Sequence, residues 1–200
     1  MASTFTDLGI ELMATGENAG TWGNKTNANL NLIEQLTGGF ATLSIAGGAG
    51  TQALDVDDGA LTGTAQQRII EFTGSISGNR IITIPNDVET FYILKNSTTG
   101  AYTVQFKYAT GSGSSTTFSA TDKGTKIVYA SASPDVTNPI IVDVMANSSE
   151  IALTNSNSIK FQDADNSAFV GIDAPATVSG SYTLTLPAAV GSASQALVTT

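Results

Sequence analysis

The side chains best suited to binding or catalytic chemistry lie in two short acidic runs of this sequence. They are LDVDDG, with Asp55, Asp57, Asp58 and Gly59, and FQDADNS, with Asp163, Asp165 and Asn166. Both begin like a calcium loop, in which alternate positions supply oxygen ligands. Neither run completes that pattern, because Gly59 stands where a fifth-position ligand belongs and Ala174 stands at the twelfth position after Asp163. We interpret both runs as turns, with cation binding as the alternative, and expect no metal site.

The rest of the sequence offers little for catalysis. It contains no histidine and no cysteine, which excludes Ser-His-Asp triads, Cys-His pairs and His-ligated or Cys-ligated zinc. No carboxylate pair stands out among the 17 acidic residues as a glycosidase would require. The glycine clusters at 46–50 and 111–115 lack the spacing of a phosphate-binding loop and are predicted turns. We expect no catalytic residue and no cofactor, and hence no enzyme.

Charge and hydropathy exclude two further classes of partner. The net charge is −9, the pI is about 4.2, and the eight Lys and Arg residues are scattered, so nothing matches a phosphate backbone. The N-terminus has no basic region typical of a signal peptide. The longest apolar runs, such as FYIL and PIIV, are far shorter than the roughly 20 residues that span a bilayer. We predict neither nucleic-acid binding nor membrane insertion.

Residues 40–146 have the pattern of a β domain. In AYTVQFKYAT, Tyr102, Val104, Phe106 and Tyr108 alternate with polar residues, which is typical of a strand with one buried face. Further strand candidates are QRIIEFTG, NRIITIP, TFYILKN, TKIVYAS and NPIIVDVMA. Short turns rich in Gly, Ser, Thr and Asn separate them, which favours an antiparallel β-sandwich or jelly roll.

Residues 1–39 contain the one helix that the sequence predicts, within GENAGTWGNKTNANLNLIEQL. Thr21 is a plausible N-cap, and Gly38 with Gly39 ends the helix. Trp22, Leu30, Ile33 and Leu36 are spaced to share one face, while the many asparagines make an isolated helix marginal. Two interpretations remain open. The four apolar residues dock on the following β domain, or the segment is an interface with other copies or a larger assembly.

From residue 147 onward bulky side chains become sparse. Strand candidates at 158–162, 168–172 and 181–186 are short and separated by Gly or Pro. A segment with so few bulky side chains buries too little apolar area by itself to offset the entropy lost when it becomes ordered. Three copies wound together would bury more. We therefore expect a trimer, and expect that the sequence is the front of a longer protein.

Several of these segments together resemble the N-terminal region of bacteriophage tail fibre proteins, especially those of marine phages that infect cyanobacteria. The resemblance covers roughly residues 8–130. Its most specific part comprises Gly16, Glu17, Gly20, Thr21, Trp22 and Gly23, followed by Thr26, Asn27 and Asn29. The segment YTLTLPAAVGSASQALVTT is similar, more weakly, to units that precede the shaft and tip of trimeric fibres.

The resemblance implies a homotrimeric structural protein of the virion tail. Residues 1–39 would anchor the fibre to tail adaptor or tube proteins, residues 40–146 would form a β-sandwich collar, and residues 147–200 would begin a β-rich shaft. The anchor residues would be Trp22, Asn27, Leu30, Ile33 and Leu36. A distal tip, absent from this sequence, would meet the host receptor. The alternatives are a fibre with a downstream polysaccharide depolymerase, a capsid-decorating protein and a bacterial surface protein.

Overall fold

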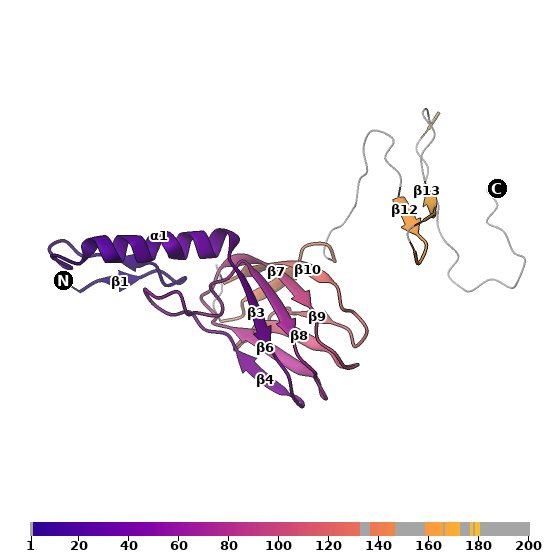
Figure 1. The fold of residues 1–200 in the computed structure, drawn as a ribbon, viewed down its shortest axis with the longest axis horizontal. Helices are drawn as coiled ribbons and strands as arrows, with labels where there is room; N and C mark the ends of the chain where they lie inside the picture. Colours follow the sequence, from indigo (N-terminus) through magenta and orange to yellow (C-terminus); the bar gives the residue numbers. More distant parts are fainter. Residues whose placement is uncertain are drawn as a thin grey trace, which may run out of the picture. The chain divides into compact units, whose positions relative to one another are not determined.

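The computed structural model describes residues 2–132, 137–146, 159–165, 167–172, 177 and 179–180. The chain divides into two compact units, Met1–Ser149 and Glu150–Thr200. Among the described residues the regular structure is mainly β, with one α-helix (Figure 1). The prediction of a mainly β protein with an N-terminal helix is thereby confirmed.

The first unit begins with an N-terminal arm, residues 2–39. Its strands β1 (Thr4–Phe5) and β2 (Glu11–Leu12) pair antiparallel and lie along helix α1 (Trp22–Gly38) (Figure 1). The helix begins directly after Thr21 and ends at Gly38, where the sequence predicted its ends. Chain direction then changes at Gly39, and the first strand of the β domain follows at once.

Two sheets form the β domain. The five-stranded sheet has the order β11-β10-β7-β5-β3, with β3 Phe40–Ser44, β5 Ile69–Thr73, β7 Thr90–Asn96, β10 Thr125–Ser131 and β11 Ile140–Asp143. The four-stranded sheet has the order β4-β6-β8-β9, with β4 Gly50–Ala53, β6 Arg80–Ile84, β8 Val104–Tyr108 and β9 Thr116–Phe118. Every strand candidate between residues 67 and 146 therefore contains an observed strand.

The pairing within these sheets corrects the antiparallel, jelly-roll-like prediction. From β3 to β8 the chain alternates between the two sheets, and each strand from β3 to β6 pairs parallel with the strand one coil later. Ile69 pairs with both Phe40 and Ile93, for example. Only β9, β10 and β11 add antiparallel partners. The first part of the domain is thus three coils of a β-solenoid, which antiparallel strands complete.

The corners between the two sheets stack on one another. Parallel bridges join Gly47 to Ile76 and Ser75 to Thr99. The amide of Ile76 donates to the Thr99 carbonyl over 2.9 Å, and that of Gly47 donates to the Ser75 carbonyl over 3.0 Å. Glycine is required at Gly100, where φ is +100° and an added Cβ would lie 2.2 Å from the Ile76 carbonyl oxygen.

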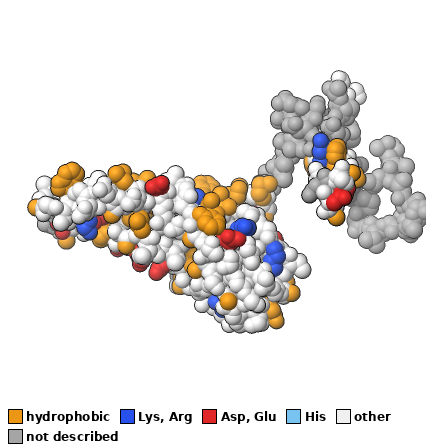
Figure 2. Space-filling view, viewed as in Figure 1, with side chains coloured by type: hydrophobic (Ala, Val, Ile, Leu, Met, Phe, Trp, Pro, Cys, Tyr) orange, Lys and Arg blue, Asp and Glu red, His pale blue; other side chains and the backbone are white. Residues whose placement is uncertain are grey.

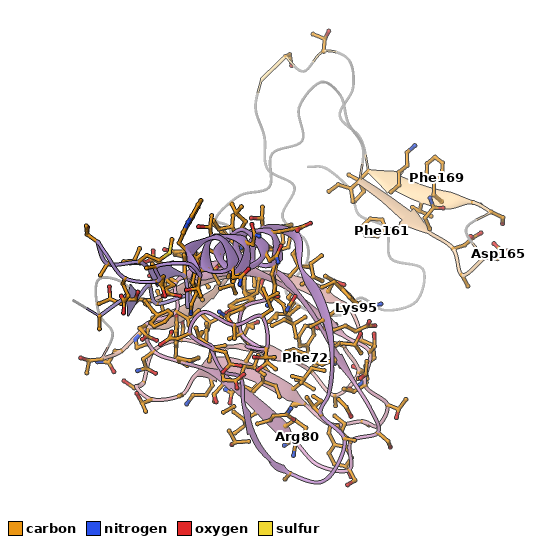
Figure 3. All side chains as sticks on the ribbon, turned by 60° about the vertical axis from the view of Figure 1, so that its left-hand side comes forward. Phe72, Arg80, Lys95, Phe161, Asp165 and Phe169 are labelled. Carbon is orange, nitrogen blue, oxygen red and sulfur yellow. The ribbon has the colours of Figure 1, made fainter. Side chains whose placement is uncertain are left out.

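The core lies between the two sheets and explains the alternation in AYTVQFKYAT, where Val104, Phe106 and Tyr108 are buried. Phe72 and Tyr92 from one sheet and Phe106 from the other are fully buried, and both rings contact Phe106, with centroids 6.5 and 5.5 Å away. Figure 3 shows Phe72 in the middle of the domain. Large side chains of this kind supply most of the burial that stabilises the two-sheet arrangement.

The second unit contains a hairpin. Strands β12 (Ile159–Gln162) and β13 (Phe169–Ile172) pair antiparallel, close to the predicted strands at 158–162 and 168–172. All residues of both strands are exposed. The third predicted strand, at 181–186, lies outside the described residues.

Candidate functional site

Helix α1 is held in place from one side by Glu11. The Asn29 side chain pairs with the Glu11 backbone in both directions, accepting from its amide at 2.9 Å and donating to its carbonyl at 2.8 Å. The Glu11 carboxylate is buried and bonds to Lys25 at 2.9 Å and to Asn18 at 3.3 Å. The hydrogen bond from Lys25 is the main cause that holds the pKa of Glu11 below its usual 4.5. These contacts hold helix α1 and the β1–β2 strand pair together.

Gln66 joins this arm to the β domain. Its fully buried side chain donates to the Leu8 carbonyl at 2.8 Å and accepts from the Asp57 amide at 3.2 Å. Next to it, the Gly59 amide donates to the Gly9 carbonyl at 2.8 Å. Because Gln66 is buried, these bonds are shielded from water, and losing them would leave polar groups unpaired. The arm is thus fastened to the domain by specific polar contacts.

Three of the predicted anchor residues form an exposed apolar stripe on this fastened helix. Trp22 is 64 %, Leu30 58 % and Ile33 46 % exposed, and at 3.6 residues per turn they fall within roughly 80° of one another. We call these three residues the helical stripe. The interpretation in which they dock on their own β domain is wrong for all three.

The other predicted anchor residues differ from the stripe. Leu36 is half-buried, and Asn27 is exposed about 60° beyond Leu30 on the helix surface. The residue that the helix buries is Leu32, which the sequence analysis did not single out. The side-chain amide of Asn29 forms both of its hydrogen bonds with Glu11 of the same chain, so it does not bond across an interface.

A second apolar surface, which the sequence analysis missed, covers the outer side of the five-stranded sheet. Strand register places Phe40, Ile69, Ile93 and Ile127 in one row across four strands. Phe91 and Tyr129 form the next row, with ring centroids 5.1 Å apart. We call the outer side of this sheet the outer sheet face. Its apolar side chains are Phe40, Ile69, Phe91, Ile93, Ile127, Tyr129, Ile140, Val142 and, directly after β11, Val144.

The apolar character of this face is visible on the surface of the molecule. Figure 2 shows hydrophobic side chains gathered where α1 gives way to the sheet, with a few charged groups beside them. Phe40 and Phe91 are 56 % and 52 % exposed. The signal in the sequence was the run of apolar residues at both odd and even positions in TFYILKN and TKIVYAS, which indicates strands that are apolar on both faces.

The strands β12 and β13 carry a third set of exposed apolar side chains. Phe161 and Phe169 lie on the hairpin in Figure 3, and Val170 is 72 % exposed. An isolated two-stranded hairpin is marginally stable in water, because it buries little apolar surface. Both of its strands thus present apolar side chains on the surface.

The acidic runs act as turn formers. The Asp55 carboxylate accepts from the amide and hydroxyl of Thr64, at 3.0 and 2.5 Å, and these bonds lower its pKa. The carboxylates of Asp163 and Asp165 both accept from the Ser167 amide at 3.0 Å. The bonds to Ser167 support the interpretation of the second run as a turn, and in the first run the Ala60 amide closes a turn by donating to the Asp57 carbonyl at 3.2 Å. Among the described residues, no group of three or more acidic side chains is placed to hold a metal ion.

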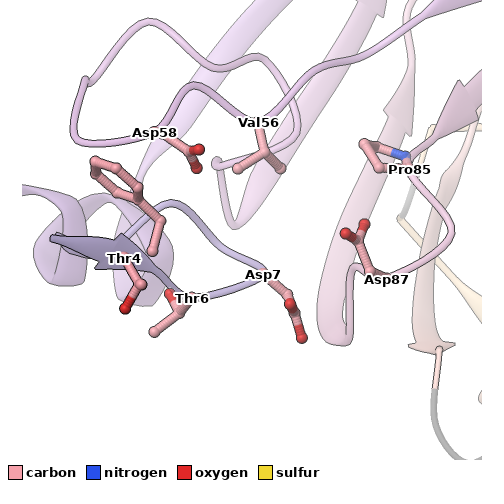
Figure 4. A pocket seen from close by; sticks show the side chains of 8 residues that line it. Thr4, Thr6, Asp7, Val56, Asp58, Pro85 and Asp87 are labelled. Atoms are coloured by element: carbon pink, nitrogen blue, oxygen red, sulfur yellow. The ribbon is translucent and has the colours of Figure 1, made fainter. Parts of the chain in front are cut away.

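An open hollow lies between the N-terminal arm and the β domain. Figure 4 shows Asp7, Asp58 and Asp87 around it, with Val56 and Pro85. Its described lining contains no lysine, arginine or histidine beside these carboxylates, and its hydroxyl groups are those of Thr4 and Thr6. The hollow thus offers shape and negative charge.

Comparison with known proteins does not assign this chain to a family. The sequence matches no protein family, and neither a curated protein nor a solved structure matches the chain. Within the described residues, no helix has the length and apolar character that crossing a bilayer demands.

Proposed function

We propose that this chain is a structural protein of a phage tail fibre, and that its N-terminal arm anchors the fibre to the tail. The observation that carries the proposal is the helical stripe. An exposed tryptophan with two aliphatic neighbours, on a helix that Glu11 holds within an arm fastened to the β domain by Gln66, has the composition of an interface anchor. Asn27 and Leu36 flank the stripe and complete the proposed contact. Its partners are tail adaptor or tube proteins.

The braced helix matters because binding is strongest where the binding groups are ordered in advance. A partner that meets the stripe does not have to order the helix first, so less of the contact energy is lost as entropy. An exposed tryptophan also contributes a large rigid area with few rotatable bonds. The arm therefore suits a permanent attachment better than a transient one.

The proposed fibre is a homotrimer. The exposed hairpin of β12 and β13 supports this, because three copies could cover one another's apolar side chains as the start of a trimeric shaft. The role is structural, without catalysis, metal or cofactor, and receptor binding belongs to a distal region outside this sequence. The virion tail is the proposed location.

Trp22→Ala tests the anchor. Because Trp22 lies on the surface, the substitution should change the free energy of unfolding by no more than about 0.5 kcal/mol. Loss of an interface anchor should weaken attachment by about 2 kcal/mol or more. The measurements are a melting curve and the fraction of purified chain that joins fibreless particles.

Tyr102→Ala is the matched control, since Tyr102 is also an exposed aromatic residue and lies outside the arm. It should attach like the unchanged chain. The fluorescence of Trp22, the single tryptophan, offers a second readout, because attachment should shift its emission to the blue and protect it from soluble quenchers. Normal attachment of Trp22→Ala would refute the anchor.

A further inference from the structure

We infer that the outer sheet face is the surface through which three copies of this chain meet in the collar. The inference rests on the proposed homotrimer and names a contact surface for it. It concerns residues 40–146, whereas the expectation of a trimer came from the lean segment after residue 147.

The size of the face is the first argument. Its nine apolar side chains expose roughly 600 Å² of surface, with about 200 Å² for a fully exposed large side chain. The largest apolar patch on a typical monomer is about 300–600 Å², and a stable interface buries about 800 Å² on each partner. The face is therefore at the upper limit for a patch left uncovered on a monomer, and in a threefold assembly it would be divided between the contacts with two neighbouring copies.

The distribution of charge identifies the occupant as a second copy. Two chains that each carry a net charge of −9 repel one another unless they meet where the surface is neutral. On this face Glu71 pairs with Lys95 at 2.9 Å, which cancels the charge of both. At its border the Glu89 carboxylate accepts from the Tyr129 hydroxyl, and Arg68 donates to the Thr90 hydroxyl at 3.1 Å.

A basic partner would instead be drawn to the acidic surface around Asp7, Asp58 and Asp87. The neutral apolar face has no feature that selects such a partner. Three copies that turn it toward a common axis would bury the row of Phe40, Ile69, Ile93 and Ile127. Each copy would contribute the same surface, as rotational symmetry requires.

The absence of cysteine from the sequence allows a direct test in the full chain. Thr125→Cys places a single thiol on the outer sheet face, beside Lys95 in the strand register. Thr117→Cys places one at another exposed threonine, on the outer side of the four-stranded sheet. Each variant is spin-labelled, and its sedimentation and electron paramagnetic resonance spectrum are recorded over a range of concentrations.

The expected result is a trimer in which the label at position 125 is immobilised and coupled to its copies, while the label at position 117 stays mobile. Coupling at position 117 alone, or equal mobility at both positions, would overturn the inference and leave the trimer standing. A chain that stays monomeric yet still attaches through Trp22 would overturn both the inference and the trimer, and would leave the anchor standing.

Phe91→Lys provides a second measurement. A charge in the middle of the face should weaken self-association at least tenfold, while dilute protein keeps its melting temperature because Phe91 is exposed. Tyr102→Lys, an exposed aromatic residue away from the face, should leave self-association unchanged. Unchanged association of Phe91→Lys would contradict the inference.

Discussion

Glu11 is the residue on which the position of the N-terminal helix depends most. Its pKa is lowered in the folded chain, chiefly by the hydrogen bond from Lys25. A group with a lowered folded-state pKa stabilises the fold fully above its unfolded-state pKa, and this stabilisation is lost as pH falls through the folded-state value. The contribution of Glu11 is therefore complete above about pH 4.5 and disappears below it.

We predict that acidification below about pH 4.5 loosens the helix in the unchanged chain. Glu11→Gln should remove most of this pH dependence, because the amide cannot titrate. The measurement is the helical circular dichroism signal as a function of pH. Lys95→Gln is the control, since it disrupts another ion pair outside the arm. If both variants keep the acid transition of the unchanged chain, the role of Glu11 is refuted.

Part of the candidate site could be predicted from the sequence, residue by residue. It identified Trp22, Leu30 and Ile33 from their types and helical spacing, and the structure places all three together on the surface. It did not anticipate the pairing of Asn29 with Glu11, because those residues are 18 positions apart and their contact depends on how the chain folds back. Helical periodicity predicts which residues share a face, whereas burial of that face depends on tertiary packing.

The solenoid corners are the elements on which the β domain depends. Gly100→Ala should destabilise the domain by about 3 kcal/mol or more, because it combines a positive φ with a Cβ that meets the Ile76 carbonyl. Gly47→Ala is the matched control, with a φ of +119° and nothing within 4 Å of an added Cβ.

Gly47→Ala should therefore cost only the backbone strain, about 1–2 kcal/mol. The measurement is the free energy of unfolding in denaturant for both variants and the unchanged chain. Equal losses for the two variants would show that the stacked corners do not restrict the space at Gly100.

The error in predicting strand pairing has a physical origin at these corners. The segments 74–78 and 96–100 are short and rich in small residues, which is typical of hairpin turns. Parallel neighbours normally need a crossover of a dozen residues or more. Here the strand in the opposite sheet is itself the crossover, so each corner stays short. Local composition predicts a turn, and it does not specify which sheet the next strand joins.

At the scale of the whole molecule, the hairpin of β12 and β13 should be ordered only in the assembled protein. We predict that its amides exchange with solvent rapidly in dilute chain and become protected as concentration rises, because its apolar side chains need neighbouring copies. The measurement is hydrogen exchange followed by mass spectrometry. Amides of β7 serve as the internal control, since that strand lies in the middle of its own sheet.

Protection of the hairpin that does not depend on concentration would contradict this prediction. The hairpin would then be stable without other copies, and its exposed side chains would no longer support a trimeric shaft. The outer sheet face would remain as a separate argument for self-association.

The strand order also determines how a pulling force would pass through the β domain of the proposed fibre. The chain enters the five-stranded sheet from the helix at β3, one edge, and leaves it at β11, the opposite edge. These two strands run in the same direction, since β3, β5 and β7 are parallel and two antiparallel pairings follow. Tension between anchor and shaft would therefore act along the strands, and many inter-strand hydrogen bonds would resist it together in shear.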